Sequence, residues 1–247
     1  MNYLIEVKNL KRYYKVGTET VHALRGVSFS IAAGEFVTIM GSSGSGKTTL
    51  LNLLGCLDTA TEGDYYLEGI SVKEMNKDQR AMLRNRKIGF VFQSYNLLPK
   101  TTAIENVELP LVYNPSFSGH ERKTKAVEML ENVGLGDRLY HTSAQLSGGQ
   151  QQRVAIARAL INEPAIILTD EATGNLDTRT SYEILSLFQQ LHQEQGRTII
   201  FITHNPELAS FSSRNIVLKD GKIVHDSLNT NIASAQEMLL QLPKQDD

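Results

Sequence analysis

The segment Gly41-Ser-Ser-Gly-Ser-Gly46-Lys47-Thr48 matches the pattern G-x-x-x-x-G-K-[ST], which is typical of loops that bind nucleotide phosphates. Glycines let the backbone curl so that its N–H groups point at phosphate oxygens, and a helix that starts there adds a favourable dipole. We expect Lys47 to reach the β and γ phosphates and the Thr48 hydroxyl to bind Mg²⁺. The complete set expected at the phosphates is Gly41, Ser42, Ser43, Gly44, Ser45, Gly46, Lys47, Thr48 and Thr49.

Two adjacent carboxylates, Asp170 and Glu171, follow the apolar run 166–169 later in the chain. Parallel sheets place ligands at the carboxyl ends of their strands, so both side chains are expected near the phosphate loop. Asp170 is expected on the side of Mg²⁺, and Glu171 could polarise an attacking water as a general base. Acids that only cap a helix are an alternative, and kinase, GTPase and motor chemistry are all still open.

A third segment, Leu146-Ser147-Gly148-Gly149-Gln150-Gln151-Gln152-Arg153, supplies a hydroxyl, two glycines and the start of a helix. These are the parts of a second phosphate-binding device. Here the sequence resembles the ABC ATPase family, whose signature is LSGGQ followed by a helix that carries an arginine. One nucleotide cannot occupy two such loops of one subunit unless the chain folds back on itself. The resemblance therefore implies a head-to-tail homodimer in the ATP-bound state, in which Ser147 of one subunit faces the γ-phosphate held by the other.

The resemblance also implies roles for single residues. Tyr14 matches the aromatic residue that stacks on adenine, although the adjacent Tyr13 is an alternative. Gln93 matches the residue that senses Mg²⁺ and the attacking water, and His204 matches the switch histidine at the γ-phosphate. Asp177 matches the segment that crosses the dimer interface. Glu171, His204 and Gln93 are the expected catalytic residues; Thr48, Gln93 and Asp170 are the expected Mg²⁺ ligands; ATP contacts are further expected from Tyr14, Ser147, Gly148, Gly149, Gln150 and Asp177.

Periodicity predicts an α/β fold. Strands are expected over residues 3–7, 21–31, 36–40, 88–92, 165–169 and 198–203, and helices over 46–57, 118–133 and 178–195. Strands that alternate with helices indicate right-handed crossovers and a parallel sheet. The family resemblance implies a P-loop NTPase with a RecA-like core, an N-terminal antiparallel β region and an inserted helical subdomain at about 94–160. Residues 1–228 are expected to form this domain, followed by a polar tail, 229–247, with a short helix near 234–242.

Composition narrows the possible partners. The chain has 247 residues, of which 25 are Lys or Arg and 27 are Asp or Glu, so its formal net charge is −2. This balance argues against a dedicated nucleic-acid binder, which usually has a basic excess. The single cysteine, Cys56, excludes an internal disulfide and is interpreted as a packing residue. No apolar run of about 18 residues is present, so membrane work is expected to need an integral-membrane partner. We expect a cytoplasmic protein, peripheral on the inner face of the cell membrane.

Within the family, the sequence is most similar to the MacB/LolD-like group of exporter and lipoprotein-release ATPases, through residues 55–58, 83–99 and 102–110. Two positions depart from the family pattern: Ala172 replaces the usual proline and Asn205 replaces the usual aspartate. The membrane partner is expected to dock beside Gln93, on the surface formed by the next 15–20 residues, which begin with the apolar-leaning loop 94–99.

Three other functions share some of these motifs. An importer ATPase would have the same motifs with a different permease. A non-transport ABC ATPase would need a long coiled-coil insertion or a second cassette, and the chain contains neither. A regulatory module that only binds ATP would be expected to lack Lys47, Glu171 or His204, all of which are present.

Overall fold

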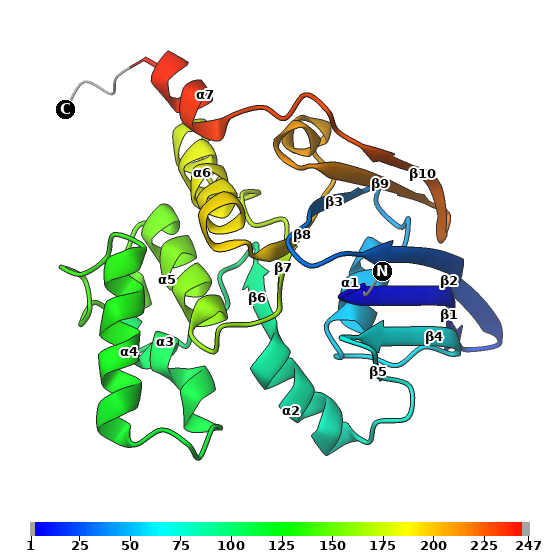
Figure 1. Cartoon of the computed structure of the whole chain (residues 1–247), viewed down its shortest axis with the longest axis horizontal. Helices are drawn as coiled ribbons and strands as arrows, with labels where there is room; N and C mark the ends of the chain where they lie inside the picture. The colour runs from blue at the N-terminus through cyan, green and yellow to red at the C-terminus, as the bar shows by residue number, and fades with distance from the viewer. Residues whose placement is uncertain (1–2, 244–247) are drawn as a thin grey trace.

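The computed structural model describes residues 3–243; Met1, Asn2 and residues 244–247 of the predicted tail lie outside the described residues. Its strands form two sheets (Figure 1), one with the order β2-β1-β4-β5 and one with the order β10-β9-β3-β8-β7-β6. The first sheet contains β1 (Ile5–Val16), β2 (Glu19–Ile31), β4 (Glu62–Leu67) and β5 (Ile70–Ser71). The second contains β3 (Phe36–Met40), β6 (Ile88–Phe92), β7 (Ile166–Asp170), β8 (Thr198–Thr203), β9 (Arg214–Lys219) and β10 (Lys222–Leu228).

The helices surround the second sheet. They are α1 (Lys47–Leu54), α2 (Lys77–Lys87), α3 (Ala103–Val112), α4 (Gly119–Asn132), α5 (Gly148–Leu160), α6 (Thr178–Gln195) and α7 (Ala235–Gln241), with short 3-10 segments at Ser143–Gln145 and Pro206–Phe211. Helices α3, α4 and α5 pack together at the end of the molecule opposite the four-stranded sheet (Figure 1). Among residues 3–243, no helix is both long and apolar enough to cross a bilayer.

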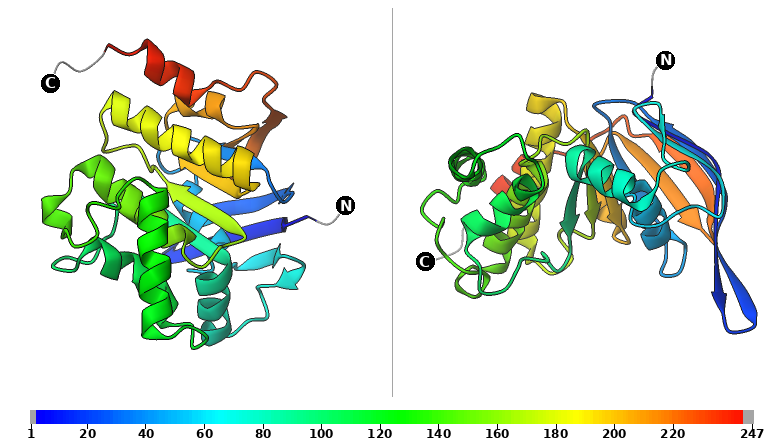
Figure 2. Two further views of the ribbon diagram at one scale, coloured as in Figure 1. Left: turned by 60° about the vertical axis from the view of Figure 1, so that its left-hand side comes forward. Right: turned by 90° about the horizontal axis from the view of Figure 1, so that it is seen from below.

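The central strands are buried on both faces, as parallel strands covered by helices are. In β8, Ile199 and Phe201 pack into the core formed with α3 to α6, whereas Ile200 and Ile202 pack into the core formed with α1 and the four-stranded sheet. The alternation of side chains along each strand therefore builds two hydrophobic cores, one on each face. Figure 2 shows the four-stranded sheet as a separate layer, with the β1–β2 hairpin projecting from the body.

The predicted fold class is confirmed: this is an α/β P-loop fold with an N-terminal antiparallel sheet and a helical subdomain. The predicted helix 178–195 and strand 198–203 have the observed bounds. Strand β1 extends nine residues beyond the predicted end at residue 7. Its pairing with β2 shifts register between Val7 and Leu10, between Leu10 and Lys11, and between Arg12 and Tyr13. These irregularities disturb the alternation by which a strand is recognised in sequence.

The helical subdomain consists of separate short helices, and each has its own start signal. Helix α4 begins at the predicted capping box of Ser118 and Glu121, and Gly134, with a φ of 76°, follows its end. Residues 94–102 of the predicted helical region are not helical, because Tyr95, Asn96 and Lys100 all have left-handed backbone conformations. The predicted tail helix is observed as α7, which packs against α6.

Candidate nucleotide-binding site

The loop between β3 and α1 can be built only with glycine at three positions. Gly44 and Gly46 have φ values of 78° and 105°, a region that other residues rarely adopt. A Cβ on Gly46 would lie 2.6 Å from the carbonyl oxygen of Ala23, and one on Gly41 would lie 2.3 Å from that of Leu218. The loop is therefore pressed against two neighbouring strands, and its chain leads directly into the N-terminus of α1.

A cavity of about 920 Å³ opens at this loop. Its wall combines β2 residues 20–23 with the loop and with the ends of two parallel strands. The predicted residues that line it are Ser42, Ser43, Gly44, Gly46, Lys47, Thr48, Thr49, Asp170, Glu171 and His204. The fold thus brings the predicted phosphate loop, both acids and the switch histidine to one space.

Lys47 spans the phosphate loop. Its Nζ donates hydrogen bonds to the carbonyl oxygens of Gly41, at 2.7 Å, and Ser42, at 2.9 Å. The ammonium group is therefore held over the loop by two neutral acceptors. A phosphate oxygen is a charged acceptor and forms a stronger hydrogen bond with the same group.

The two acids occupy the end of β7, which lies between β6 and β8 in the sheet. Burial raises the pKa of Asp170, the neighbouring Glu171 adds to this rise, and Lys47 opposes it. Glu171 has a φ of 49°, and its N–H donates to the carbonyl oxygen of Ile202 at 2.9 Å. Its Oε1 lies 2.5 Å from Nδ1 of His204. The predicted base and the predicted histidine are therefore in contact.

The site fits a metal that takes few protein ligands. Among the described residues, no group of three or more His, Cys, Asp or Glu side chains is placed to hold an ion. Thr48 and Asp170 nevertheless line the same cavity as the phosphate loop. Mg²⁺ typically binds one or two carboxylates and completes its shell with water and substrate phosphates, so this pair of oxygen ligands suits it.

Gln93 does not line the cavity; it is bound to the loop after β7 instead. Its Nε2 donates to Oδ1 of Asn175 at 3.1 Å, and Nδ2 of Asn175 donates to the carbonyl oxygen of Gln93 at 3.2 Å. This reciprocal amide pair joins segments that are 82 residues apart. The roles of Gln93 as a metal ligand and water sensor remain predictions.

The residues of the signature segment also lie outside the cavity. Ser147 caps α5: its Oγ accepts from the backbone N–H of Gln150 at 3.3 Å, and Oε1 of Gln150 accepts from the N–H of Ser147 at 2.9 Å. A Cβ on Gly148 would lie 2.8 Å from the hydroxyl of Tyr95, and one on Gly149 would lie 2.4 Å from Cγ2 of Thr180. Both glycines therefore allow close packing inside the chain, while the exposed Ser147 marks a free helix start.

Asp177 has a visible structural role in the chain. It caps α6, with Oδ1 accepting from the N–H of Thr180 at 2.9 Å and Oδ2 accepting from its hydroxyl at 2.6 Å. These hydrogen bonds lower the pKa of Asp177. A contact between Asp177 and nucleotide remains a prediction.

Tyr14 belongs to a cluster of three polar side chains beside the cavity. Its hydroxyl donates to Oδ2 of Asp58 at 2.9 Å, and the Arg12 guanidinium lies 4.6 Å from the centre of its ring. Arg12 also donates to both oxygens of Asp58, each at 2.8 Å. Val21, the cross-strand partner of Tyr14, lines the cavity. Tyr13 instead packs against His22, with ring centres 4.3 Å apart.

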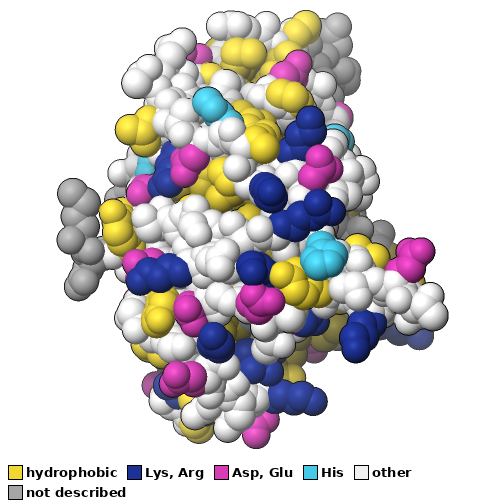
Figure 3. Space-filling model, turned by 90° about the vertical axis from the view of Figure 1, so that its right-hand side faces the viewer, with side chains coloured by type: hydrophobic (Ala, Val, Ile, Leu, Met, Phe, Trp, Pro, Cys, Tyr) yellow, Lys and Arg dark blue, Asp and Glu magenta, His cyan; other side chains and the backbone are white. Residues whose placement is uncertain are grey.

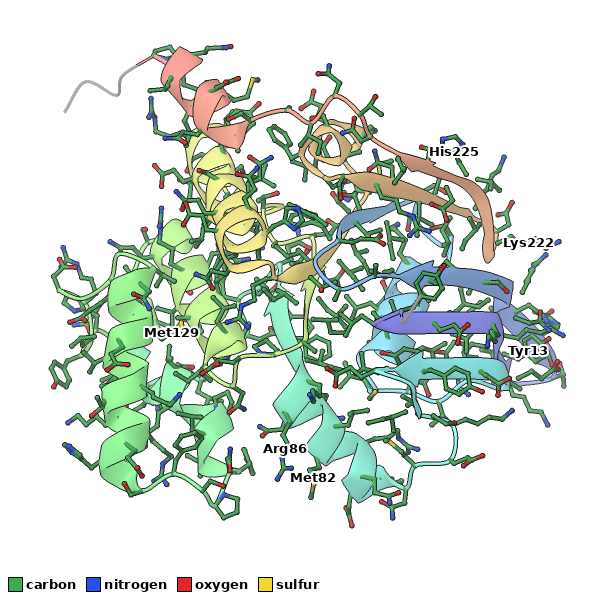
Figure 4. The ribbon with its side chains drawn as sticks, in the orientation of Figure 1. Tyr13, Met82, Arg86, Met129, Lys222 and His225 are labelled. Carbon is green, nitrogen blue, oxygen red and sulfur yellow. The ribbon has the colours of Figure 1, made fainter. Side chains whose placement is uncertain are left out.

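A second cavity, of about 820 Å³, lies between α2, β6 and α3. We call it the α2–α3 groove; its lining includes Met82, Phe90, Leu109 and Tyr113, together with Arg84, Arg86 and Arg158. Figure 4 shows Met82 and Arg86 on the side of α2 that faces the helical subdomain. Of the 15–20 residues after Gln93 that were expected to receive a partner, the groove residues are Asn96, Leu109, Pro110 and Tyr113, and Asn96 alone comes from the loop 94–99.

Arg158 joins the groove to the loop after Gln93. It donates to the carbonyl oxygens of Asn96, at 2.6 Å, and Tyr95, at 2.8 Å, and burial lowers its pKa. No acidic residue lines the groove, and among residues 3–243 none of its three arginines forms an ion pair. The groove is therefore apolar with a cationic rim.

The face that carries the antiparallel sheet is different in charge. Figure 3 shows Lys or Arg and Asp or Glu side chains close together there, and ion pairs such as Lys11–Glu62, at 2.8 Å, join strands of that sheet. The sequence reasoning missed Asp58, Asn175, Arg158 and the α2 face of the groove. Each acts through contacts with residues distant in the chain, and no local pattern marks them.

Comparisons with known proteins agree with this geometry. A family model described as ABC transporter matches residues 24–174. An uncharacterised ABC transporter ATP-binding protein of Thermotoga maritima is 55% identical over 223 residues, which are 90% of this chain and 94% of the relative. A macrolide export ATP-binding/permease protein MacB of Syntrophobacter fumaroxidans is 51% identical over 225 residues, which are 91% of this chain and 32% of the relative. The chain thus spans about a third of that MacB protein.

The solved structures that match this chain are also ABC transporter cassettes. The ATP-binding cassette MJ0796, from Methanocaldococcus jannaschii, has been solved as a dimer in a post-hydrolysis state bound to ADP and Pi. Its chain superimposes on this one with a TM-score of 0.83 and 47% identity, and the match covers 91% of this chain and 98% of that one. A second dimeric structure of MJ0796 gives a TM-score of 0.83 at 48% identity.

Proposed function

The chain belongs to the ABC transporter family and is an ATP-binding cassette ATPase, and we propose that it works as a head-to-tail homodimer that drives an integral-membrane partner. One observation carries the dimer: the cavity at the phosphate loop is lined by Lys47, Glu171 and His204 but not by Ser147. The exposed N-terminus of α5 therefore has no phosphate to bind within its own chain. MJ0796, which has been solved as a dimer, supports the association of two such cassettes.

In the proposed reaction, the phosphate loop and Lys47 bind the β and γ phosphates of ATP. Thr48 and Asp170 would hold Mg²⁺, with Gln93 as a further proposed contact, and the ion would supply neutralisation of negative charge on the phosphates. Glu171 accepts a proton from the attacking water, and His204 holds that carboxylate in place and contacts the γ-phosphate. Ser147 of the partner subunit closes the site.

The membrane partner is proposed to insert a short helical segment with an acidic side chain into the α2–α3 groove. The apolar lining suits the apolar face of a helix. The arginines at positions 84, 86 and 158 suit a carboxylate, since, among the described residues, two of them hydrogen-bond only to backbone carbonyls and no acidic residue in the groove neutralises any of the three. An occupant of the groove that binds Arg158 would also affect the position of Tyr95, because Arg158 donates a hydrogen bond to the Tyr95 carbonyl. The hydroxyl of Tyr95 lies against Gly148 of the signature segment.

Export or extraction of a substrate is the proposed direction, because relatives named MacB combine ATP-binding and permease parts in one export protein. An importer subunit is the alternative, and a many-span permease as partner would favour it. Either role places this chain at the inner face of the cell membrane. The substrate is determined by the partner.

The experiment is to co-express the chain with the integral-membrane protein encoded beside its gene and to purify the pair in detergent. We expect the wild-type chain to co-purify and Arg86→Glu not to, while the ATPase rate of the isolated chain stays within about twofold, since Arg86 lies outside the nucleotide cavity. Lys77→Glu is the matched control: it makes the same charge change on α2 outside the groove and should co-purify. Equal recovery of both variants would overturn the groove as the docking site.

A further inference from the structure

Gln152 lies on the signature helix α5 and is completely buried, with 0% of its side chain area exposed. Its Nε2 donates a hydrogen bond of 2.7 Å to the carbonyl oxygen of Ala172. Among the described residues this is the one hydrogen bond that the carbonyl accepts. The other amide atom of Gln152, Oε1, is buried with no partner among the described residues.

The unpaired oxygen has a consequence for the choice of glutamine at position 152. An apolar side chain of similar size would remove this unpaired atom but would leave the buried carbonyl of Ala172 without its hydrogen bond, and the two penalties are of similar size. The directed hydrogen bond, and not a gain in stability, is therefore what distinguishes the glutamine from an apolar residue. The glutamine supplies a single directed hydrogen bond to the peptide that joins Ala172 to Thr173, which is the second peptide after Glu171.

That peptide belongs to the turn that aims the predicted general base. Glu171 holds a left-handed conformation, and its carbonyl oxygen accepts from the N–H of Gly174 at 2.9 Å. Ala172 lacks the ring with which proline would restrict φ at this position. The hydrogen bond from Gln152 restrains a different torsion, ψ of Ala172, which orients the Ala172 carbonyl, and it thereby limits movement of the turn that follows Glu171.

The same hydrogen bond connects two parts of the proposed reaction. Gln152 is five positions after Ser147 on one continuous helix, so a displacement of the helix start is transmitted to the glutamine as a rigid body. In the proposed dimer, Ser147 contacts the nucleotide of the partner subunit, whereas Glu171 serves the nucleotide of its own subunit. Helix α5 therefore links the two sites. It reaches the turn that carries Glu171 through the hydrogen bond from Gln152 to the carbonyl of Ala172.

We propose that Gln152 is a positioning residue for hydrolysis, which holds the Ala172 carbonyl so that Glu171 faces the attacking water only when the signature helix is in place. The proposal rests on the proposed role of Glu171. It concerns the rate of the chemical step and not the binding of ATP, because Gln152 lies outside the nucleotide cavity.

The test compares two buried glutamines. Gln152→Leu removes both the donor and the unpaired oxygen. Gln189→Leu is the matched control, because Gln189 is a buried glutamine on a different helix, α6. Its side chain also donates to backbone carbonyls, those of Phe211 at 3.1 Å and Ala233 at 2.7 Å. We expect Gln152→Leu to lower kcat by about 10–100-fold with KM for ATP within about twofold, the size of effect that a small misplacement of a catalytic group produces. Gln189→Leu should lower Tm and leave kcat within about twofold.

A second comparison changes the backbone at Ala172, the residue whose carbonyl Gln152 contacts. Ala172→Pro restores a restriction on φ, and the N–H of Ala172 makes no hydrogen bond among the described residues that the proline would remove. In the Ala172→Pro background, the loss of kcat caused by Gln152→Leu should be smaller. Gln152→Met replaces Gln152→Leu if the leucine variant does not fold, as checked by circular dichroism.

The outcomes separate this inference from the function on which it rests. Normal turnover of Glu171→Gln would overturn the proposed function. If Glu171→Gln abolishes turnover but Gln152→Leu has the kcat of the wild type, the proposed function stands and the positioning role is overturned. The positioning role would also be overturned if Gln152→Leu lowered kcat by the same factor in the wild-type background and in the Ala172→Pro background, because Gln152 would then not act through the Ala172 carbonyl.

Discussion

Oε1 of Glu171 lies 2.5 Å from Nδ1 of His204, at the adjoining ends of β7 and β8. The two side chains differ in exposure: 64% of the His204 side chain is exposed, against 21% for Glu171. The carboxylate is thus fixed by its turn, while the imidazole lies mostly in the open cavity. This arrangement suits a stationary base with a histidine that has room to reach a phosphate.

Glu171→Gln should therefore bind ATP but hydrolyse it slowly. The amide keeps the shape of the side chain and removes its ability to accept a proton, and positioned bases contribute about 10²–10⁴-fold to a rate. Single-turnover hydrolysis and nucleotide binding are measured on the same preparation. A closed dimer should accumulate with ATP in gel filtration, and turnover within threefold of wild type would contradict the assignment.

Cys56 should be unreactive in the folded protein. Only 2% of its area is exposed, and burial raises its pKa to about 11, so the reactive thiolate is scarce at pH 8. A thiol reagent at pH 8 should label the chain slowly in buffer and completely, at one site, in denaturant. Rapid labelling of the native chain would show that Cys56 is not the packing residue that its sequence context suggests.

Much of the site follows from the sequence because each part is local. The phosphate loop and the acids after 166–169 are short runs with their own chemistry, and the parallel sheet gathers strand ends at one edge. The hydrogen bond of Arg158 to Tyr95 spans 63 positions and has no local signal. The groove was predicted only in part, because α2 forms one of its walls and the sequence reasoning gave α2 no bounds.

Tyr14 should matter for nucleotide affinity more than its neighbour does. It shares a face of the β1–β2 ladder with Val21 at the cavity, and Arg12 and Asp58 fix its ring. Tyr14→Ala should raise the Kd for ATP by about 5–100-fold, since stacking of a base on an aromatic ring contributes about 1–3 kcal/mol. Calorimetric titration measures this.

Two comparisons make that prediction specific. Tyr13→Ala, a change of the same size on the next residue, should raise the Kd much less than Tyr14→Ala does, since the ring of Tyr13 packs against His22 and is not itself among the residues that line the cavity. Asp58→Ala should raise the Kd by less than Tyr14→Ala, because it frees the ring without removing it. A larger effect from Tyr13→Ala would reassign the adenine contact to that residue.

The composite site makes a prediction about mixed dimers, which decides whether Lys47 and Ser147 act on one ATP from different subunits. Pair a Lys47→Ala chain with a Ser147→Arg chain: across the interface, one site then has both defects and the other site has none. Pair instead a doubly substituted chain with an otherwise unchanged one: each site then has one defect. Sites shared between subunits therefore predict one occluded ATP per dimer in the first pairing and almost none in the second, whereas sites within one chain predict the reverse.

Occlusion of labelled ATP is measured in a Glu171→Gln background, because hydrolysis could require both sites at once. Two affinity tags, one on each chain, select the mixed dimers and exclude dimers of identical chains. The Ser147→Arg side chain blocks an exposed helix start and also removes the cap of α5, which costs about 0.5–2 kcal/mol of stability, so Tm of each variant is measured to show that the chain is folded. Equal occlusion in the two pairings would overturn the shared site and the dimeric motor together.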